Sequence, residues 1–258
     1  MIDVLKFVYR GILTGMPMIT YNSITKNTLN VPMVVKPWST YLNFKLDSQQ
    51  VDYLNDYIHE YSNMTIIPIK IRPNKDPEYI LSVNIYNCTS PVFFNKEKEI
   101  TRCEINTYVT DGKNNGTMIL DYASNDLSMD PINIMKMKND VRFNDEGTFR
   151  DLYCNSVKDE IILNMSYTQY YAHKTKIGNE LIDYTDRVYY KNGIYDKIYY
   201  DASLTKGRVK TPYLHKNFEF SYKGMVFTNI YSLFFFTDEI RFIGGMWDNV
   251  FEENNTNC

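Results

Sequence analysis

Apolar and polar residues alternate along most of this chain, with the period of two that is typical of β-strands. In residues 40–46, Leu42 and Phe44 share one face while Tyr41 and Asn43 share the other. Successive side chains of a strand point to opposite faces, so this pattern predicts a strand with one buried face. The same period predicts further strands at 79–87, 101–110, 117–124, 148–154, 160–168, 218–222, 225–236 and 240–243.

One segment follows a helical period instead. Val51, Leu54, Ile58 and Tyr61 recur at the spacing that places side chains on one side of a helix. Ser48 precedes them, and serine is a frequent N-cap because its hydroxyl accepts a hydrogen bond from a backbone N–H of the first turn. The sequence therefore predicts one early amphipathic helix that starts with Ser48 as its N-cap and lies on the core.

Turn-forming residues separate the predicted strands. Residues 111–116 read Asp-Gly-Lys-Asn-Asn-Gly, which predicts a turn between two strands. Asn192 and Gly193 within 189–200 are the signature of a tight hairpin. Pro68 interrupts another alternating run and predicts an edge strand or a bulge there.

These elements predict a mostly β (α+β) fold, a single antiparallel β-barrel-like domain over residues 1–258 with one early helix. Residues 1–38 hold three prolines without a sustained period and are expected to form a wrapping arm. Residues 248–258 are expected to form a polar tail. The apolar positions expected in the core are Leu42, Phe44, Val83, Ile85, Ile105 and Val109.

The composition excludes several classes of protein. With 44% hydrophobic and 23% charged residues, the chain is globular rather than disordered. Its net charge of -3 and scattered lysines argue against a nucleic-acid partner, which requires a basic patch. No stretch approaches the roughly 20 apolar residues of a membrane helix, so no membrane partner is expected. A homo-oligomer is not excluded.

The cysteines and histidines show no metal or cofactor pattern. The four cysteines lie far apart, without a Cys-x-x-Cys pair, and the three histidines are isolated. We therefore expect no metal, no cofactor and reduced thiols in a cytoplasmic, reducing compartment, because the N-terminus also makes a poor signal peptide. Abundant Asn, Ile, Lys and Tyr with few Ala indicate an AT-rich genome, such as that of a protist or a large DNA virus.

Two places carry candidate chemistry. Glu104, Asn106 and Tyr108 lie on one face of the strand predicted at 101–110. If that face lines the interior, a carboxylate, an amide and a phenol converge there; if it faces outward, they are ordinary solvated groups.

The second place is residues 131–138, a helical turn or an irregular crossover. Lys136 lies there among isoleucines and methionines. Desolvation lowers the pKa of a lysine and makes its amine nucleophilic near neutral pH. The alternative is an amphipathic turn with lysines that extend into solvent.

Taken in order along the chain, these predicted elements and their short motifs resemble the acetoacetate decarboxylase-like superfamily, including its uncharacterised bacterial branch. The resemblance covers roughly residues 38–145. It rests on Asn-Phe-Lys-Leu-Asp at 43–47 before the helix, Asn-Cys-Thr-Ser at 87–90, Glu104 on the next strand, the Gly-containing return at 112–121, and the Pro-initiated crossover.

The resemblance implies a β-barrel-like fold with a central pocket and a Schiff-base lysine, for which Lys136 is the counterpart. In the family a second lysine follows directly, whereas here Met137 intervenes and Lys138 is the second lysine. An acidic residue expected on the preceding strand is replaced by Asn84. Members that have departed from the paired-lysine pattern are therefore the better model.

Three functions remain open at this point. The first is a lyase acting on a small keto compound, with Lys136 as nucleophile, Glu104 as acid/base and Lys138 as electrostatic partner. Asn84, Asn106 and Tyr108 would then bind the substrate. The second is a ligand-binding or structural β-barrel without catalysis, and the third is an interaction subunit that uses the tyrosine-rich residues 184–200.

Overall fold

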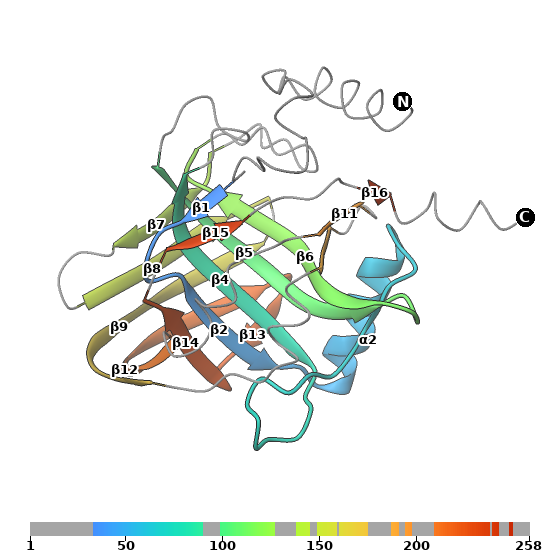
Figure 1. Ribbon diagram of the computed structural model, residues 1–258, viewed down its shortest axis with the longest axis horizontal. Coiled ribbons are helices and arrows are strands. Elements are labelled where there is room, and N and C mark those ends of the chain that lie inside the picture. The colour runs from blue at the N-terminus through green and yellow to red at the C-terminus, as the bar shows by residue number, and fades with distance from the viewer. Residues whose placement is uncertain are drawn as a thin grey trace, which may run out of the picture.

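The computed structural model describes residues 33–89, 99–126, 138–144, 149–158, 160–174, 187–190, 194–197, 209–237, 239–242 and 248–249. Within them the chain forms one helix and sixteen strands (Figure 1). Their bounds are β1 (Met33–Val35), β2 (Thr40–Lys45), α2 (Ser48–His59), β3 (Thr65–Ile66), β4 (Ile80–Thr89), β5 (Glu99–Thr110), β6 (Asn115–Ser124), β7 (Asp140–Asn144), β8 (Phe149–Ser156), β9 (Ile161–Lys174), β10 (Arg187–Tyr190), β11 (Ile194–Lys197), β12 (Val209–Tyr222), β13 (Met225–Phe227), β14 (Ser232–Phe236), β15 (Ile240–Phe242) and β16 (Asp248–Asn249).

The strands follow one another in a long hydrogen-bonded order. It runs β16-β11-β10-β6-β5-β4-β2-β14-β12-β9-β8-β7, with β1, β3, β13 and β15 attached at the side. The prediction of a mostly β fold with one early helix is therefore confirmed. Nearly all pairs are antiparallel, but β10 runs parallel to β6, which the alternation pattern could not reveal.

The expectation of a closed barrel is corrected, because the sheet is open. In the described part of the chain, β16 and β7 stand at its two ends and do not pair with each other. Figure 1 shows β4, β5 and β6 in front of β8, β9 and β12. Ile105 and Ala123 belong to the same core as Leu152 and Leu163, so side-chain packing rather than hydrogen bonding joins the two halves.

The core predicted from the alternation is confirmed. All six apolar side chains that were expected to be buried have an exposed fraction of 0%: Leu42, Phe44, Val83, Ile85, Ile105 and Val109. Phe44 also stacks on Phe218 and Phe220 at centroid distances of 5.7 and 4.7 Å, which links β2 to β12.

Helix α2 buries Val51, Leu54 and Ile58, as predicted. Tyr61, which was expected on the same side of the helix, lies beyond its last residue and is exposed. Its N-cap, however, is Asp47 rather than Ser48. The Asp47 carboxylate accepts a hydrogen bond from the Gln50 backbone N–H at 2.9 Å, and the Gln50 side chain accepts one from the Asp47 N–H at 3.0 Å. This reciprocal capping box satisfies two N–H groups at once, and a serine one residue later cannot do so.

Some strands lie where none were predicted. Within the expected arm, β1 pairs with β4 and β15, and within the expected tail, β16 pairs with β11. β7 also went unpredicted because it is only five residues long. Pro68 ends the regular pairing of its segment after β3, leaving only an isolated bridge between Ile69 and Glu78. No helix in the described part of the chain combines the length and apolar character that crossing a bilayer requires.

Candidate functional site

Both faces of β4 and β5 are buried. Leu81, Val83 and Ile85 point into the main core. The residues between them point to the opposite face, where Ile80 and Tyr108 pack beneath Ile69 and Ile71 of the segment after β3. We call this opposite face of the β2–β4–β5–β6 sheet the polar face, and its members used below are Tyr41, Ser82, Asn84, Tyr86, Arg102, Glu104, Asn106, Tyr108 and Tyr122.

The strand register brings the predicted residues together on this face. Asn84 lies opposite Glu104, with Tyr41 on the other side of Asn84 and Tyr122 on the other side of Glu104. Asn106 forms the neighbouring row. Directly opposed side chains on one face have Cβ atoms about 5 Å apart, so these groups are neighbours. Asn84, Glu104 and Asn106 are 5%, 7% and 5% exposed, so these side chains are buried, on the face of the sheet opposite the main core.

Glu104 takes part in a buried ion pair through one of its two oxygens. Its Oε1 accepts a hydrogen bond from the Tyr86 hydroxyl at 2.5 Å and lies 2.9 Å from Arg102 Nε. The Arg102 guanidinium in turn lies 3.9 Å from the centroid of the Tyr122 ring. Burial and the Glu104 charge raise the pKa of Tyr86, so its phenol keeps its proton and acts as a donor. Within the described residues, Glu104 Oε2 has no partner.

Two further polar atoms of this face are unpartnered within the described residues. Asn106 Oδ1 is fully buried and accepts no hydrogen bond. The Tyr41 hydroxyl also makes none, although its ring is fixed by stacking on Phe234 at 5.3 Å and by an edge contact with Phe236 at 5.6 Å. Burial, followed by the charge of Glu104, raises the pKa of Tyr41, so its hydroxyl is a neutral donor.

The other two predicted binding residues already have partners. Asn84 Oδ1 accepts a hydrogen bond from Ser39 Oγ at 3.1 Å. The Tyr108 hydroxyl lies 3.3 Å from Ser82 Oγ, which donates to Asn43 Oδ1 at 2.6 Å. Burial raises the pKa of Tyr108. Of the predicted set, Glu104 and Asn106 therefore offer open hydrogen-bonding atoms, whereas Asn84 and Tyr108 belong to a bonded network.

The predicted lysines are placed only in part. Lys136 lies outside the described residues. The Lys138 side chain is 58% exposed, and its Nζ lies 2.9 Å from Asp126 Oδ1, beyond the end of β6. The roles of both lysines stay predictions.

Arg102, Tyr86 and Tyr41 contribute to the polar face but were missed. Arg102 could have been predicted from the period of two, because it precedes Glu104 by two residues on the same strand and therefore shares its face. Tyr41 and Tyr86 become neighbours of Glu104 only through the pairing of β2 with β4 and of β4 with β5. Register between strands is not visible in a local pattern, so these two residues could not be found from the period alone.

A second buried carboxylate, Asp121, lies on the opposite side of the sheet. Asp121 pairs with Ile105, whose side chain lies in the main core, so Asp121 points to that side as well. Its oxygens accept hydrogen bonds from Tyr57 of α2 at 3.0 Å and from Tyr222 of β12 at 2.6 Å. Lys223 Nζ lies 3.8 Å away. Asp121 therefore joins α2, β6 and β12 and has no open role on the polar face.

The described cysteines are free and buried. They are Cys88, Cys103 and Cys154, while Cys258 lies outside the described residues. Burial raises the pKa of Cys88 to about 12, and a hydrogen bond with Cys154 followed by burial raises that of Cys103. Both thiols are therefore protonated near neutral pH and are poor nucleophiles. No group of three or more potential metal ligands gathers anywhere in the described part of the chain.

Comparison with known proteins gives matches among solved structures only. No family model matches the chain, and neither does a curated protein. The acetoacetate decarboxylase of Legionella pneumophila matches with 11% identity and a TM-score of 0.44, covering 89% of this chain and 95% of that one. An acetoacetate decarboxylase-like enzyme of Sphingomonas wittichii matches with 8% identity and a TM-score of 0.44, covering 88% and 97%. The enduracididine biosynthesis enzyme MppR matches with 8% identity and a TM-score of 0.47, covering 88% and 91%.

Proposed function

We propose that this protein binds a small keto compound on the polar face. The observation that carries the proposal is the buried, unpartnered Asn106 Oδ1, together with the Tyr41 hydroxyl and Glu104 Oε2, which make no hydrogen bond within the described residues. A buried polar group without a partner costs about 1–3 kcal/mol, so a ligand that supplies the missing partners recovers that free energy on binding.

The chemistry of the three atoms suits a ketone beside an amine. The Tyr41 hydroxyl is a donor, and a keto oxygen accepts hydrogen bonds. Glu104 Oε2 and Asn106 Oδ1 are acceptors, and they require an N–H or O–H group. A lysine amine, or the iminium that it forms with a ketone, supplies such an N–H. We propose Lys136 for that part.

In the catalytic form of the proposal, the neutral Lys136 amine attacks the keto carbon and water leaves to give an iminium. Glu104 relays one proton from the attacking nitrogen to the departing oxygen, solvent supplies the second proton that lets this oxygen leave as water, and Lys138 keeps the Lys136 amine neutral by charge repulsion. Asn84, Asn106 and Tyr108 hold the substrate. The iminium then accepts an electron pair when a bond of the substrate breaks, as in a lyase.

A second candidate function is binding or structural support without catalysis. The observation in its favour is the environment of Glu104. Its charge is compensated by Arg102, and its Oε1 already accepts a hydrogen bond from the Tyr86 hydroxyl. A carboxylate held this way stabilises the sheet pairing whether or not it transfers protons. In its ligand-binding form, the second candidate places the ligand on the same face and differs from the first only in that no covalent bond to lysine forms.

Borohydride reduction in the presence of pyruvate separates the two candidates. If Lys136 forms an imine, hydride reduces it to a stable amine, and the Lys136 peptide gains the mass of one reduced pyruvate unit. We expect this adduct in the native protein and its loss in Lys136→Ala, with an unchanged thermal unfolding midpoint. Peptide mass spectrometry is the measurement. A native protein without the adduct across a panel of small keto acids would leave only the non-catalytic candidate.

A further inference from the structure

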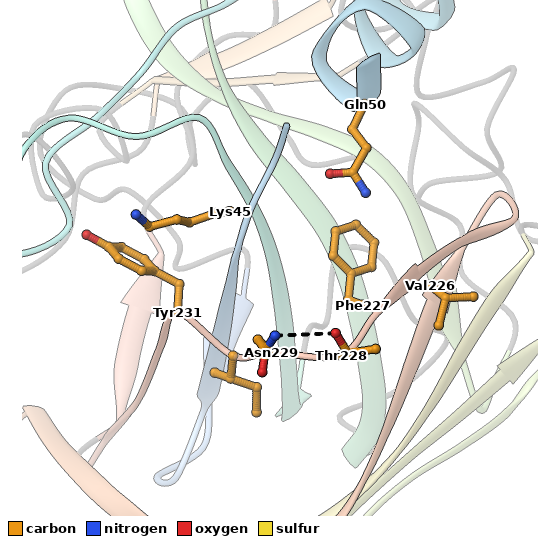
Figure 2. Close-up of a pocket in the computed structure, with 8 residues that line it drawn as sticks. Lys45, Gln50, Val226, Phe227, Thr228, Asn229 and Tyr231 are labelled. Carbon is orange, nitrogen blue, oxygen red and sulfur yellow. Dashed lines mark hydrogen bonds between the residues drawn. The ribbon is translucent and has the colours of Figure 1, made fainter. Parts of the chain in front are cut away.

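A surface pocket lies apart from the polar face, where the pairing between β2 and its neighbour stops. β14 pairs with β2 only as far as Asn43, and the chain between β13 and β14 then turns away. The resulting hollow has a volume of about 510 Å³, within the range of small-molecule sites. Lys45 at the end of β2, Gln50 in the first turn of α2 and residues 226–231 line it (Figure 2).

Several hydrogen-bond donors line this pocket, and one of them carries a positive charge. Lys45 Nζ carries three N–H groups, and Glu78 takes one of them. The Oε1 atom of Gln50 is used in the capping box, which leaves its NH₂ group available. The backbone N–H groups of residues 228–230, like their carbonyl groups, belong to no strand and have no backbone partner in the described part of the chain. A charged ammonium beside such neutral donors can hold an anionic acceptor.

The rest of the lining combines the polar side chains of Thr228 and Asn229 with apolar and aromatic ones. Phe227 is 7% exposed and packs against Phe44 at a centroid distance of 5.1 Å. Tyr231 presents its ring to Lys45, whose Nζ lies 4.7 Å from the ring centroid. In Figure 2, Lys45 and Tyr231 lie together on one side of the pocket and Phe227 lies between them and Val226. A ligand with an apolar ring beside its charged group would contact both kinds of surface.

We propose that this pocket binds a small organic carboxylate with an apolar or aromatic body, whose carboxylate displaces or joins Glu78 on Lys45. Within the protein itself, the Glu78 carboxylate is the anion that pairs with the Lys45 ammonium. The Lys45 and Glu78 side chains are 47% and 32% exposed, so an exchange between Glu78 and a ligand requires no opening of the core.

Lys45 binds such a ligand by charge and not by imine formation. The hydrogen bond with Glu78 raises the pKa of Lys45, so its ammonium stays protonated near neutral pH. A protonated amine is not a nucleophile. The pocket is thus chemically different from the site proposed on the polar face, where a neutral amine is required.

Calorimetric titration with benzoate and with its uncharged analogue benzamide tests the proposal. We expect benzoate to bind the native protein with a Kd of about 1 mM and benzamide to bind at least about tenfold more weakly, since a charge-assisted hydrogen bond is lost. Lys45→Met should weaken benzoate binding about tenfold. Lys113→Met, which removes an exposed lysine from the turn before β6, is the matched control and should bind as the native protein does.

Glu78→Gln supplies a second test that keeps Lys45 in place. Removal of the internal competitor should tighten benzoate binding about twofold to fivefold, in keeping with the strength of an exposed ion pair. Amide shift changes in residues 226–231 on addition of benzoate would locate the ligand. The proposal is overturned if benzamide binds as tightly as benzoate, if the Lys45→Met and Lys113→Met proteins bind benzoate alike, or if Glu78→Gln weakens binding.

Discussion

Val83→Asp is expected to abolish the soluble, folded protein. Val83 has an exposed fraction of 0% and lies in the centre of β4, between β2 and β5. A carboxylate at this position would be buried among apolar side chains of the main core without a partner, which costs several kcal/mol. Domains of this size are stable by only about 5–15 kcal/mol, so the substitution removes much or all of the stability.

The measurement is soluble yield together with cooperative urea unfolding. Val157→Asp is the matched control, because Val157 is 87% exposed in the turn after β8 and the same chemical change there meets water. We expect the control to fold as the native protein does. A Val83→Asp protein that is soluble and unfolds cooperatively would show that β4 is not a central core strand.

Arg102→Met is expected to destabilise the protein by about 3–5 kcal/mol, because it leaves the Glu104 charge buried without its cation. The side chains of Arg102 and Glu104 are 3% and 9% exposed, so water compensates little for the loss. In the double variant Arg102→Met with Glu104→Gln, both charges are absent. We expect that variant to regain most of the lost free energy of unfolding, as buried ion pairs replaced on both sides commonly do.

Urea unfolding of the native, two single-variant and double-variant proteins completes the cycle. The structure predicts strong coupling, with the double variant more stable than Arg102→Met alone. Additive losses would mean that the two side chains act independently, and the buried ion pair on the polar face would then be refuted.

The sequence predicts the core of this fold well because strand alternation is local. Residues two positions apart in a strand point to the same side. The sides of Val83 and Ile105 relative to these neighbours therefore follow from backbone geometry alone. The burial of the opposite face could not be predicted in the same way. Asn84 and Glu104 are covered because distant segments pack over that side, and the pattern of β4 and β5 holds no information about them.

The candidate site was predictable along a strand but not across strands. Glu104 and Asn106 were found because they share one strand face. Tyr41 joins them only through the register of β2 with β4, which depends on the whole sheet. The bulge beside Ile105 likewise leaves Leu120 as an extra residue on the main-core side, and no turn residue or glycine in the sequence marks it. The sheet stays open for a similar reason, since closure depends on how its two end strands meet.

Titration of pyruvate into the Lys45→Met protein and into its Tyr41→Phe variant tests the central claim most directly. Pyruvate is also a carboxylate, and the Lys45→Met background removes the ammonium of the surface pocket. Tyr41→Phe removes only the hydroxyl that we propose donates to the keto oxygen and keeps the ring that stacks on Phe234, so the variant should fold. Tyr53→Phe, at an exposed position, is the matched control. We predict that pyruvate binds the parent and the Tyr53→Phe protein alike and binds Tyr41→Phe about tenfold more weakly. Equal binding to the Tyr41→Phe and Tyr53→Phe proteins, or no binding of pyruvate by the parent, would contradict a keto-compound site on the polar face.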